Sequence, residues 1–481
     1  MTTRTTNLCT FCRPVKAFDT IQHPLLFQIL GKYLVDVVKK MYKNCTVSYK
    51  LEKETINIQY NTGVQQGDNA SPVLFAYIMQ AFLDTLKTET KSSEFRYFKT
   101  PKNGNLKALN GRLTGQPTTS KGTPFEFNNV FFVDDSIFIP DNLKELENLT
   151  PILIQHFKRL GMQMHVGNNN TKSKTEAMFF PESLKEARNL TTSGILPPDI
   201  KLPDNQHVRF THSFKYLGST ITTELNEDAE IKARIKKAKS LLGAARHFFN
   251  NKDVDIRTKY TIYNSFVINA ALWGCESWNL SGKNKKQLES FHHSAIRKIL
   301  NIKWQQVQDE RIRNKQVRFR FCNIPKIETY INRRTATYIG KNARSNVEDL
   351  PKKFLGAWMY QPRKIGGPQL SCNNNFARAI SAILPDIQSG DKGLPFKEWI
   401  PIALNEPEWL NYINAYFESC KTIDEDRDDE EIKNNARENP QSRRQQHHTP
   451  ASASTSTTSS TPQCLAPTLP LQTPDTRTTH A

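Results

Sequence analysis

The chain has 481 residues, 37 % of them hydrophobic and 23 % charged, which is enough to build more than one folded domain. Its 66 Lys and Arg outnumber 47 Asp and Glu, and the formal net charge of +19 predicts a polyanionic partner, with nucleic acid as the first candidate. No apolar run reaches the roughly 18 residues of a membrane span, the first residues contain no apolar signal core, and the cysteines are scattered. We therefore expect an intracellular protein without a membrane partner.

The segment from the N-terminus to residue 222 alternates short apolar runs with turn signals, which predicts an α+β layer. Residues 47–51 and 56–60 predict two strands around a Glu-Lys-Glu turn. A mostly buried helix is predicted for residues 71–86, because Pro72 suits the first turn of a helix.

Residues 130–140, VFFVDDSIFIP, predict a hairpin whose two apolar arms flank an Asp-Asp-Ser turn. The helix that follows is predicted to begin at a Thr150 cap and to end at Gly161.

The region 223–420 is predicted to be mainly helical, because apolar side chains recur at helical spacing. Over residues 229–249 one apolar face consists of Ile231, Ile235, Ala238, Leu242 and Ala245. The lysines that lie largely off this face are Lys232, Lys236, Lys237 and Lys239. A second apolar face consists of Leu288, Phe291, Ala295 and Ile299. The densely basic stretch 311–321 is either a solvated face or a contact with a phosphate backbone.

The composition changes at Lys421, where an acidic run is followed by a stretch rich in Ser, Thr and Pro. Residues 421–481 have too few apolar side chains to form a core, so we expect a disordered tail. This tail holds 7 Lys and Arg against 9 Asp and Glu, so the positive excess of the chain belongs to its folded body.

The most informative polar pair is Asp134 and Asp135, between the two apolar arms of the predicted hairpin. Two adjacent carboxylates at a rigid turn concentrate negative charge in a way that suits Mg²⁺. Aspartate is also a common turn former, so the pair alone is more readily explained as a plain turn.

Five blocks around this pair carry a resemblance through their order and spacing. They are KAFDTIQHPLLFQIL (16–30), GVQQGDNASPVLF (63–75), VFFVDDSIFI (130–139), LGMQMHVGNNNTKSKTEAMFF (160–180) and FKYLGSTIT (214–222). Together they resemble the palm motifs of reverse transcriptases, in particular those of non-LTR (LINE-type) retrotransposons. The resemblance covers roughly residues 8–225. It continues more weakly to about residue 305 through ALWGCESWNL and FHHSAIRKIL.

The resemblance implies a domain order. Residues 1–222 would form a right-hand polymerase palm, an antiparallel sheet with packed helices. A helical thumb-like region would occupy 223–305. Beyond the resemblance, side-chain spacing and composition predict a helical basic region over 306–420 and the disordered tail over 421–481.

The resemblance also implies RNA-directed DNA synthesis, with an RNA template, a DNA primer, dNTPs and two Mg²⁺ (or Mn²⁺) ions. Asp134 matches the hairpin carboxylate that ligates the metal, and Asp135 matches its acidic neighbour. Lys174 matches the basic residue that assists the departing pyrophosphate.

Further residues match binding positions of the same family. Phe18 matches the aromatic gate that excludes a 2′-hydroxyl, and Gln66 and Gly67 match the block that contacts the template and the incoming nucleotide. The hairpin that grips the primer end is matched by Tyr216, Leu217 and Gly218. On the helix over 229–249, the expected contacts with the nucleic-acid backbone are Lys232, Lys236 and Lys237.

The first block departs from the family pattern at the other metal ligand. The position that normally holds an Asp, three residues before Lys16, holds Arg13 and is followed by Pro14. A guanidinium does not lose its proton in a protein, and proline cannot donate to a sheet ladder. Asp19 would lie roughly 20 Å away along an extended strand. We therefore expect an incomplete metal site.

Three hypotheses follow from these observations. The first is a retrotransposon reverse transcriptase that is impaired by Arg13 and by mostly missing fingers, as in an N-terminally truncated copy. The second is a catalytically inactive relic that binds nucleic acid through charge. The third is an unrelated basic interaction protein in which Asp134 and Asp135 only form a turn. A nuclear destination is compatible with the first two, although the diffuse basic clusters do not establish it.

Overall fold

The computed structural model describes residues 7–52, 54–65, 67–89, 95–99, 105–106, 123–140, 142–168, 171–180, 184–359, 372–387 and 394–421. These residues all lie in the first of two compact units, Met1–Glu425, and the second unit is Asp426–Ala481. None of the described helices is both long enough and apolar enough to cross a membrane. The predicted disordered tail lies outside the described residues except for Lys421, which ends a helix over 406–421.

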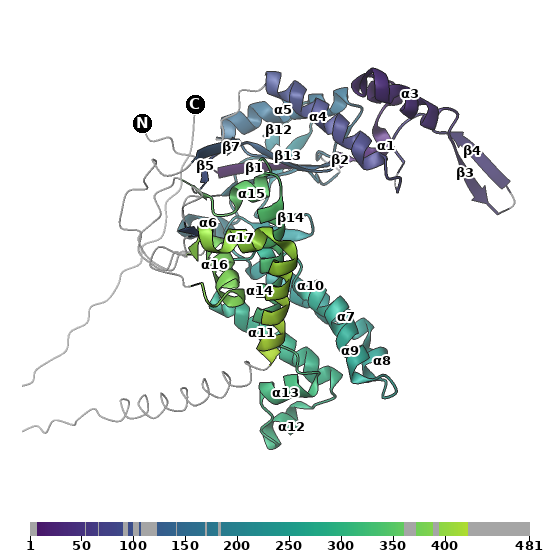
Figure 1. Ribbon diagram of the computed structural model, residues 1–481. Helices are drawn as coiled ribbons and strands as arrows, with labels where there is room; N and C mark the ends of the chain where they lie inside the picture. The colour runs from purple at the N-terminus through teal and green to yellow at the C-terminus, as the bar shows by residue number, and fades with distance from the viewer. Residues whose placement is uncertain are drawn as a thin grey trace, which may run out of the picture. The chain divides into compact units, whose positions relative to one another are not determined.

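A six-stranded sheet organises the N-terminal part of the fold, with the strand order β12-β13-β11-β1-β9-β8. Strands β1, β12 and β13 of this sheet are labelled in Figure 1. Its strands are β1 (Asn7–Cys12), β8 (Asn129–Phe132), β9 (Asp135–Phe138), β11 (Glu176–Phe180), β12 (Ile200–Lys201) and β13 (His207–Phe210). The central strand β1 pairs antiparallel with both β9 and β11. The predicted hairpin around the Asp-Asp pair is confirmed as β8 and β9.

The prediction of a wholly antiparallel sheet is wrong at one pairing, because β11 and β13 run parallel. The chain leaves β11, passes through helix α6 (Leu184–Ser193) and strand β12, and only then enters β13. A long crossover of this kind is what lets two strands of one sheet point in the same direction, whereas a tight turn would force them antiparallel.

Two long helices, α4 (Ser71–Glu89) and α5 (Leu143–Arg159), pack with the sheet in one hydrophobic cluster. Within the cluster the rings of Phe82 and Phe157, one from each helix, lie with their centroids 4.5 Å apart. Strand residues Cys12 and Phe138 are buried in the same cluster. This packing fixes the sheet end at which β1 stops and the Asp hairpin turns.

The end of α5 was predicted correctly, but its start was not. Gly161 has φ +77 and terminates the helix, as expected. The N-terminal cap is Asn142, whose side chain accepts a hydrogen bond from the Glu145 amide at 2.9 Å. Thr150 lies inside the helix and donates its hydroxyl to the carbonyl of Leu146 at 2.7 Å. A threonine can bond back to the preceding turn in this way, so its presence before Pro151 does not mark a helix start.

The smaller elements of this part are short helices and two-stranded ribbons. The helices are α1 (Ala17–Thr20), α2 (His23–Ile29) and α3 (Gly31–Tyr42). The ribbons pair β3 (Thr46–Leu51) with β4 (Glu54–Gln59), β2 (Pro14–Val15) with β10 (Gln163–Met164), and β14 (Ser213–Tyr216) with β15 (Ser219–Thr222). The predicted hairpin over 47–60 is thus confirmed, as is the predicted helix that begins at Ser71.

The region after Thr222 is mainly helical, as predicted. Its α-helices are α7 (Asp228–Ala244), α8 (Arg246–Asn250), α9 (Ile256–Ile262), α10 (Asn269–Ala271), α11 (Gly282–Ile299), α12 (Trp304–Asp309), α13 (Asn314–Arg320), α14 (Ile327–Arg344), α15 (Leu350–Phe354), α16 (Cys372–Ile383) and α17 (Phe396–Leu404). A π-helical turn over Tyr263–Ile268 joins α9 to α10, and a 3₁₀ turn over Cys275–Ser277 follows α10.

Both predicted apolar helix faces are confirmed. Ile231, Ala238 and Leu242 of α7 are buried in one cluster with Leu288, Phe291, Ala295 and Ile299 of α11, and Ile235 and Ala245 pack against it. The predicted helix over 229–249 is two helices, because α7 ends at Ala244 and α8 begins at Arg246.

Short strands within the C-terminal helical region were not predicted. β16 (Trp358–Met359) pairs with β5 (Phe95–Lys99), which also pairs with β7 (Thr123–Phe127). β17 (Leu394–Pro395) pairs with β6 (Asn105–Leu106). Two-residue strands have no recognisable sequence period, so only their distant partners define them.

Candidate functional site

The Asp hairpin turns through two residues, Val133 and Asp134, between the paired residues Phe132 and Asp135. Val133 has φ +58, which is a strained conformation for a β-branched side chain. Phe132 and Val133 are 58 % and 42 % exposed, so the tip presents apolar surface to solvent next to the carboxylates. Strain at an exposed turn points to a functional constraint on this hairpin.

Arg13 lies where the central strand ends, directly beside this hairpin. β1 stops at Cys12, which faces Ser136 on β9. The Arg13 Nε–H donates to Oδ1 of Asp135 at 2.9 Å, and its Nη2–H donates to the carbonyl oxygen of Lys215 at 2.9 Å. The guanidinium carbon also lies 5.1 Å from the centre of the Phe214 ring. One side chain therefore joins the Asp hairpin to the β14–β15 hairpin.

Burial raises the pKa of two groups around Arg13. Desolvation raises the pKa of Asp134; the neighbouring Asp135 charge also raises it, while Arg13 lowers it. Burial likewise raises the pKa of Tyr216 to about 12, with a further rise from Asp135. The Tyr216 hydroxyl is buried and has no hydrogen-bond partner among the described residues. The centre is thus a partly dehydrated place where negative charge is disfavoured unless a cation accompanies it.

The residues present do not fit the two-metal site that the resemblance implies. Among the residues that the structure describes, no group of three or more His, Cys, Asp or Glu side chains lies close enough to hold a metal ion. Arg13 occupies the expected carboxylate position and is bonded to Asp135. Asp19 does not lie at the far end of an extended strand, and that expectation was wrong, because residues 17–20 form helix α1.

The other residues with implied roles are placed as follows. Phe18 stacks on Phe75 of α4 with ring centroids 4.4 Å apart, so it is part of the hydrophobic packing. Gly67 has φ +93 and open space around its α-carbon, and Gln66 lies outside the described residues. Lys174 is exposed in the loop before β11, and its amide donates to the His165 carbonyl at 3.2 Å.

Leu217 and Gly218 form the two-residue turn of the β14–β15 hairpin, flanked by Tyr216 paired with Ser219. Their φ values are +47 and +83, the signature of a type I′ turn, in which a leucine is unusual. These two residues and Tyr216 thus lie together on the hairpin that Arg13 touches through Lys215.

A buried ion pair on α7 holds this hairpin and was not foreseen from the sequence. Glu230 and Arg234 are ion-paired at 2.5 Å and are both buried. Glu230 accepts a hydrogen bond from the Thr220 amide at 2.7 Å, and Arg234 donates to the carbonyl of Gly218. The sequence did carry a signal for this pair. Glu230 and Arg234 are four residues apart and fall on the buried face of α7, where an unpaired charge would be destabilising.

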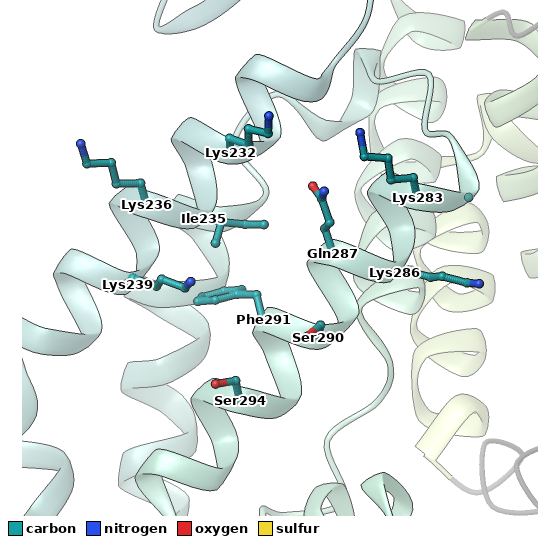
Figure 2. A pocket seen from close by; sticks show the side chains of 11 residues that line it. Lys232, Ile235, Lys236, Lys239, Lys283, Lys286, Gln287, Ser290, Phe291 and Ser294 are labelled. Atoms are coloured by element: carbon teal, nitrogen blue, oxygen red, sulfur yellow. The ribbon is translucent and has the colours of Figure 1, made fainter. Parts of the chain in front are cut away.

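A lysine-rich groove runs between α7 and α11 and has a volume of about 1070 Å³ (Figure 2). Its lysines are Lys232, Lys236, Lys239, Lys283 and Lys286. Ile235 and Phe291 supply the apolar part of its lining, and the remaining lining residues are uncharged. Of the three lysines predicted to contact a backbone, Lys232 and Lys236 line the groove, whereas Lys237 is exposed elsewhere on α7.

The basic stretch 311–321 divides between surface and core. Arg311, Arg313 and Arg320 are exposed. Arg318 is buried, and its Nη1 lies 3.2 Å from Nε2 of His293. At Arg318 both predicted alternatives are therefore wrong, because the side chain is a core component rather than a solvated or phosphate-binding charge.

The N-terminal part of the chain matches a known family. Residues 3–221 match the family described as "Reverse transcriptase (RNA-dependent DNA polymerase)". This part is therefore a reverse transcriptase-like domain, and it contains the Asp hairpin and the β14–β15 turn. No curated protein matches the chain significantly.

Similar solved structures include two telomerases. One is telomerase from Candida albicans in complex with a TWJ fragment of telomeric RNA, with 10 % identity and a TM-score of 0.29 over 63 % of this chain and 49 % of that chain. The other is apo telomerase from Candida tropicalis, with 10 % identity and a TM-score of 0.26 over 75 % of this chain and 53 % of that chain. The chain thus spans about half the length of each telomerase chain.

Replacing Asp134 by Asn is expected to stabilise the chain at neutral pH. Because burial raises the pKa of Asp134, the folded chain binds the carboxyl proton more tightly than the unfolded chain does. The stability that this group contributes is therefore present in acid and is lost as the pH rises through its folded-state pKa. By calorimetry, Asp134→Asn should raise Tm by about 1–2 °C at pH 7, and the gain should vanish below about pH 4.

Asp228→Asn is the matched control, because its hydrogen bond from Lys283 lowers the pKa of Asp228. This variant should lower Tm at pH 7 and approach the natural chain in acid. A lower Tm for Asp134→Asn at pH 7 would contradict the assignment of a burial penalty to that carboxylate.

Proposed function

We propose that this chain is a reverse transcriptase-derived protein of retrotransposon origin that binds nucleic acid and does not extend a primer. The observation that carries the proposal is the 2.9 Å ion pair between Arg13 and Asp135. It places a permanent positive charge at the position where the family needs a carboxylate, and the guanidinium cannot be neutralised by deprotonation.

Three consequences of that ion pair argue against synthesis. Asp135 already has a cation partner, Asp134 sits in partly dehydrated surroundings that disfavour its charge, and a dication placed between them would meet the guanidinium at short range. Displacing Arg13 would also break its bond to the Lys215 carbonyl and loosen the β14–β15 hairpin. Arg13 both pairs with Asp135 and anchors the β14–β15 hairpin, so moving it away from Asp135 would also release the hairpin.

Binding is supported by the lysine-rich groove between α7 and α11. Its lysines come from both helices and line a groove with an apolar floor and no acidic lining residue. A phosphate backbone gains affinity from such a row of charges by releasing counterions, whatever its base sequence. The groove is built on the buried cluster shared by α7 and α11, so the lysines are presented from a rigid surface.

Two separate observations support the proposed retrotransposon origin of the chain. The family match over residues 3–221 supports a reverse transcriptase ancestry. The order of the five sequence blocks supports the non-LTR type. A protein of this ancestry would meet RNA and DNA in the nucleus, which is where we propose that it acts.

A second candidate function is residual RNA-directed DNA synthesis. The observation that favours it is that Arg13 brings the Asp134 hairpin and the Tyr216–Gly218 turn together, which the family resemblance implies for the meeting point of template, primer and dNTP. The two candidates make opposite predictions for synthesis and the same prediction for binding.

Primer extension separates the two candidates. On a poly(rA)/oligo(dT) duplex with Mg²⁺ or Mn²⁺, the natural chain should give no extension, yet it should bind the same duplex in a salt-sensitive manner. The control is the double variant Asp134→Ala, Asp135→Ala, which should behave identically in the synthesis assay. Extension by the natural chain that disappears in this control would refute the proposal and establish the second candidate.

Removing charge from the groove should reduce the salt dependence of binding. In the triple variant Lys232→Gln, Lys236→Gln, Lys239→Gln, each lost phosphate contact should lower the slope of log Kobs against log[salt] by about 0.9, so we expect a change of about 2 to 3. Fluorescence anisotropy of a labelled duplex between low and moderate salt gives this slope.

The matched control removes three exposed lysines that do not line the groove, Lys201, Lys341 and Lys397. It changes the net charge by the same amount, so it measures the general effect of charge. Equal slopes for the two triple variants would mean that the groove is not where the backbone binds.

A further inference from the structure

Trp273 is an exposed tryptophan in a segment that is otherwise anchored in the core. It is 55 % exposed, whereas Leu272, Cys275 and Trp278 around it are 0 %, 2 % and 4 % exposed. The segment between α10 and α11 therefore keeps a fixed path while one indole is turned outward. A single exposed aromatic side chain is common on protein surfaces, so its significance depends on what holds it and what lies beside it.

The indole lies directly against the turn of the β14–β15 hairpin. A Cβ atom added at Gly218 would be 3.4 Å from Nε1 of Trp273, and one added at Gly274 would be 3.1 Å from Oγ of Ser219. Both glycines have positive φ, +83 and +76, so the two segments meet through residues without side chains. This close approach places Trp273 beside the strained Leu217 at the tip of the hairpin.

Arginines fix both sides of this contact. Arg234 donates to the carbonyl of Gly218 on the hairpin side. On the tryptophan side, Arg334 of α14 donates to the carbonyl of Leu272 at 3.3 Å and to the side chain of Asn269. These bonds hold the backbone on both sides of the indole, and a preorganised surface loses less conformational freedom when a ligand binds.

We propose that Trp273 is a stacking platform for an unpaired base of a bound nucleic-acid strand, at the turn of the β14–β15 hairpin. The indole face accepts any base, and stacking of this kind does not depend on sequence. Lys215, exposed two residues before Leu217, supplies a positive charge for the backbone of that strand. The inference rests on the proposed nucleic-acid binding and adds to it a second contact of a different physical kind.

The site is therefore distinct from the lysine groove in what it recognises. The groove would bind phosphates of either strand, whereas Trp273 would bind a base that is not paired. A ligand with a single-stranded overhang should use both contacts, and a fully paired duplex should use only the groove.

The test places 2-aminopurine at successive positions of the overhang of an oligonucleotide duplex and measures its fluorescence with the full chain. The natural chain should quench the probe strongly at one unpaired position. Trp273→Leu should abolish that quenching and weaken binding of the overhang duplex by about 5- to 100-fold. Trp273→Phe should retain most of both effects, because it keeps an aromatic face. The salt slope should not change in either variant, since no charge is removed.

The matched control is Trp304→Leu, which removes a tryptophan that is 64 % exposed and lies 5.9 Å from the guanidinium of Arg297. It should bind and quench like the natural chain. Equal quenching and affinity for the natural chain and Trp273→Leu, with salt-sensitive binding intact, would overturn the platform and leave the proposed function standing. Equal quenching and affinity for the Leu and Phe variants would also overturn the platform, because stacking requires an aromatic face. Failure of the natural chain to bind any duplex would refute the proposed function itself.

Discussion

The contact on which the centre of this protein depends is the ion pair between Arg13 and Asp135. It forms because β1 is the central strand of the sheet and ends at Cys12, so the next residue emerges beside the Asp hairpin. Pro14 then begins a separate two-residue strand that pairs with β10 rather than continuing β1. The guanidinium also reaches the Lys215 carbonyl, and one cationic side chain consequently fixes the relative position of three segments that are far apart in the sequence.

The second hairpin of the site is also held by a second ion pair, which bonds its turn and its second strand. Glu230 and Arg234 are buried on α7 and bond to the backbone of Thr220 and Gly218. A buried ion pair is tolerated when its remaining donors and acceptors are satisfied, and here the hairpin backbone satisfies them. Lys232 and Lys236 of the same helix line the groove. Helix α7 therefore links the reverse transcriptase-like domain to the basic surface through packed and hydrogen-bonded contacts.

Local patterns predicted much of the fold. The helix faces of α7 and α11, the helix that begins at Ser71 and the Asp hairpin all follow from side-chain spacing and turn residues within one segment. Long-range features did not follow from such patterns. The parallel pairing of β11 with β13 depends on the path between them, and Thr150 was mistaken for a cap because its hydroxyl bonds backward along the helix.

For the candidate site too, the sequence predicted individual residues but not their distant partners. The sequence places Arg13 at the metal-ligand position, but its partners Asp135 and Lys215 lie 122 and 202 residues away and become visible only in the structure. Likewise, Lys236 was predicted from its own helix, whereas Lys283 and Lys286 join the groove because α11 packs beside α7.

The measurement that tests the account most directly is Mn²⁺ binding by electron paramagnetic resonance. The natural chain should bind no Mn²⁺ at the Asp hairpin, and the double variant Arg13→Asp, Pro14→Val should acquire a site that Asp134→Ala removes. Mn²⁺ bound by the natural chain and lost in Asp134→Ala would contradict the account, because it would show that the ion pair leaves the metal position open.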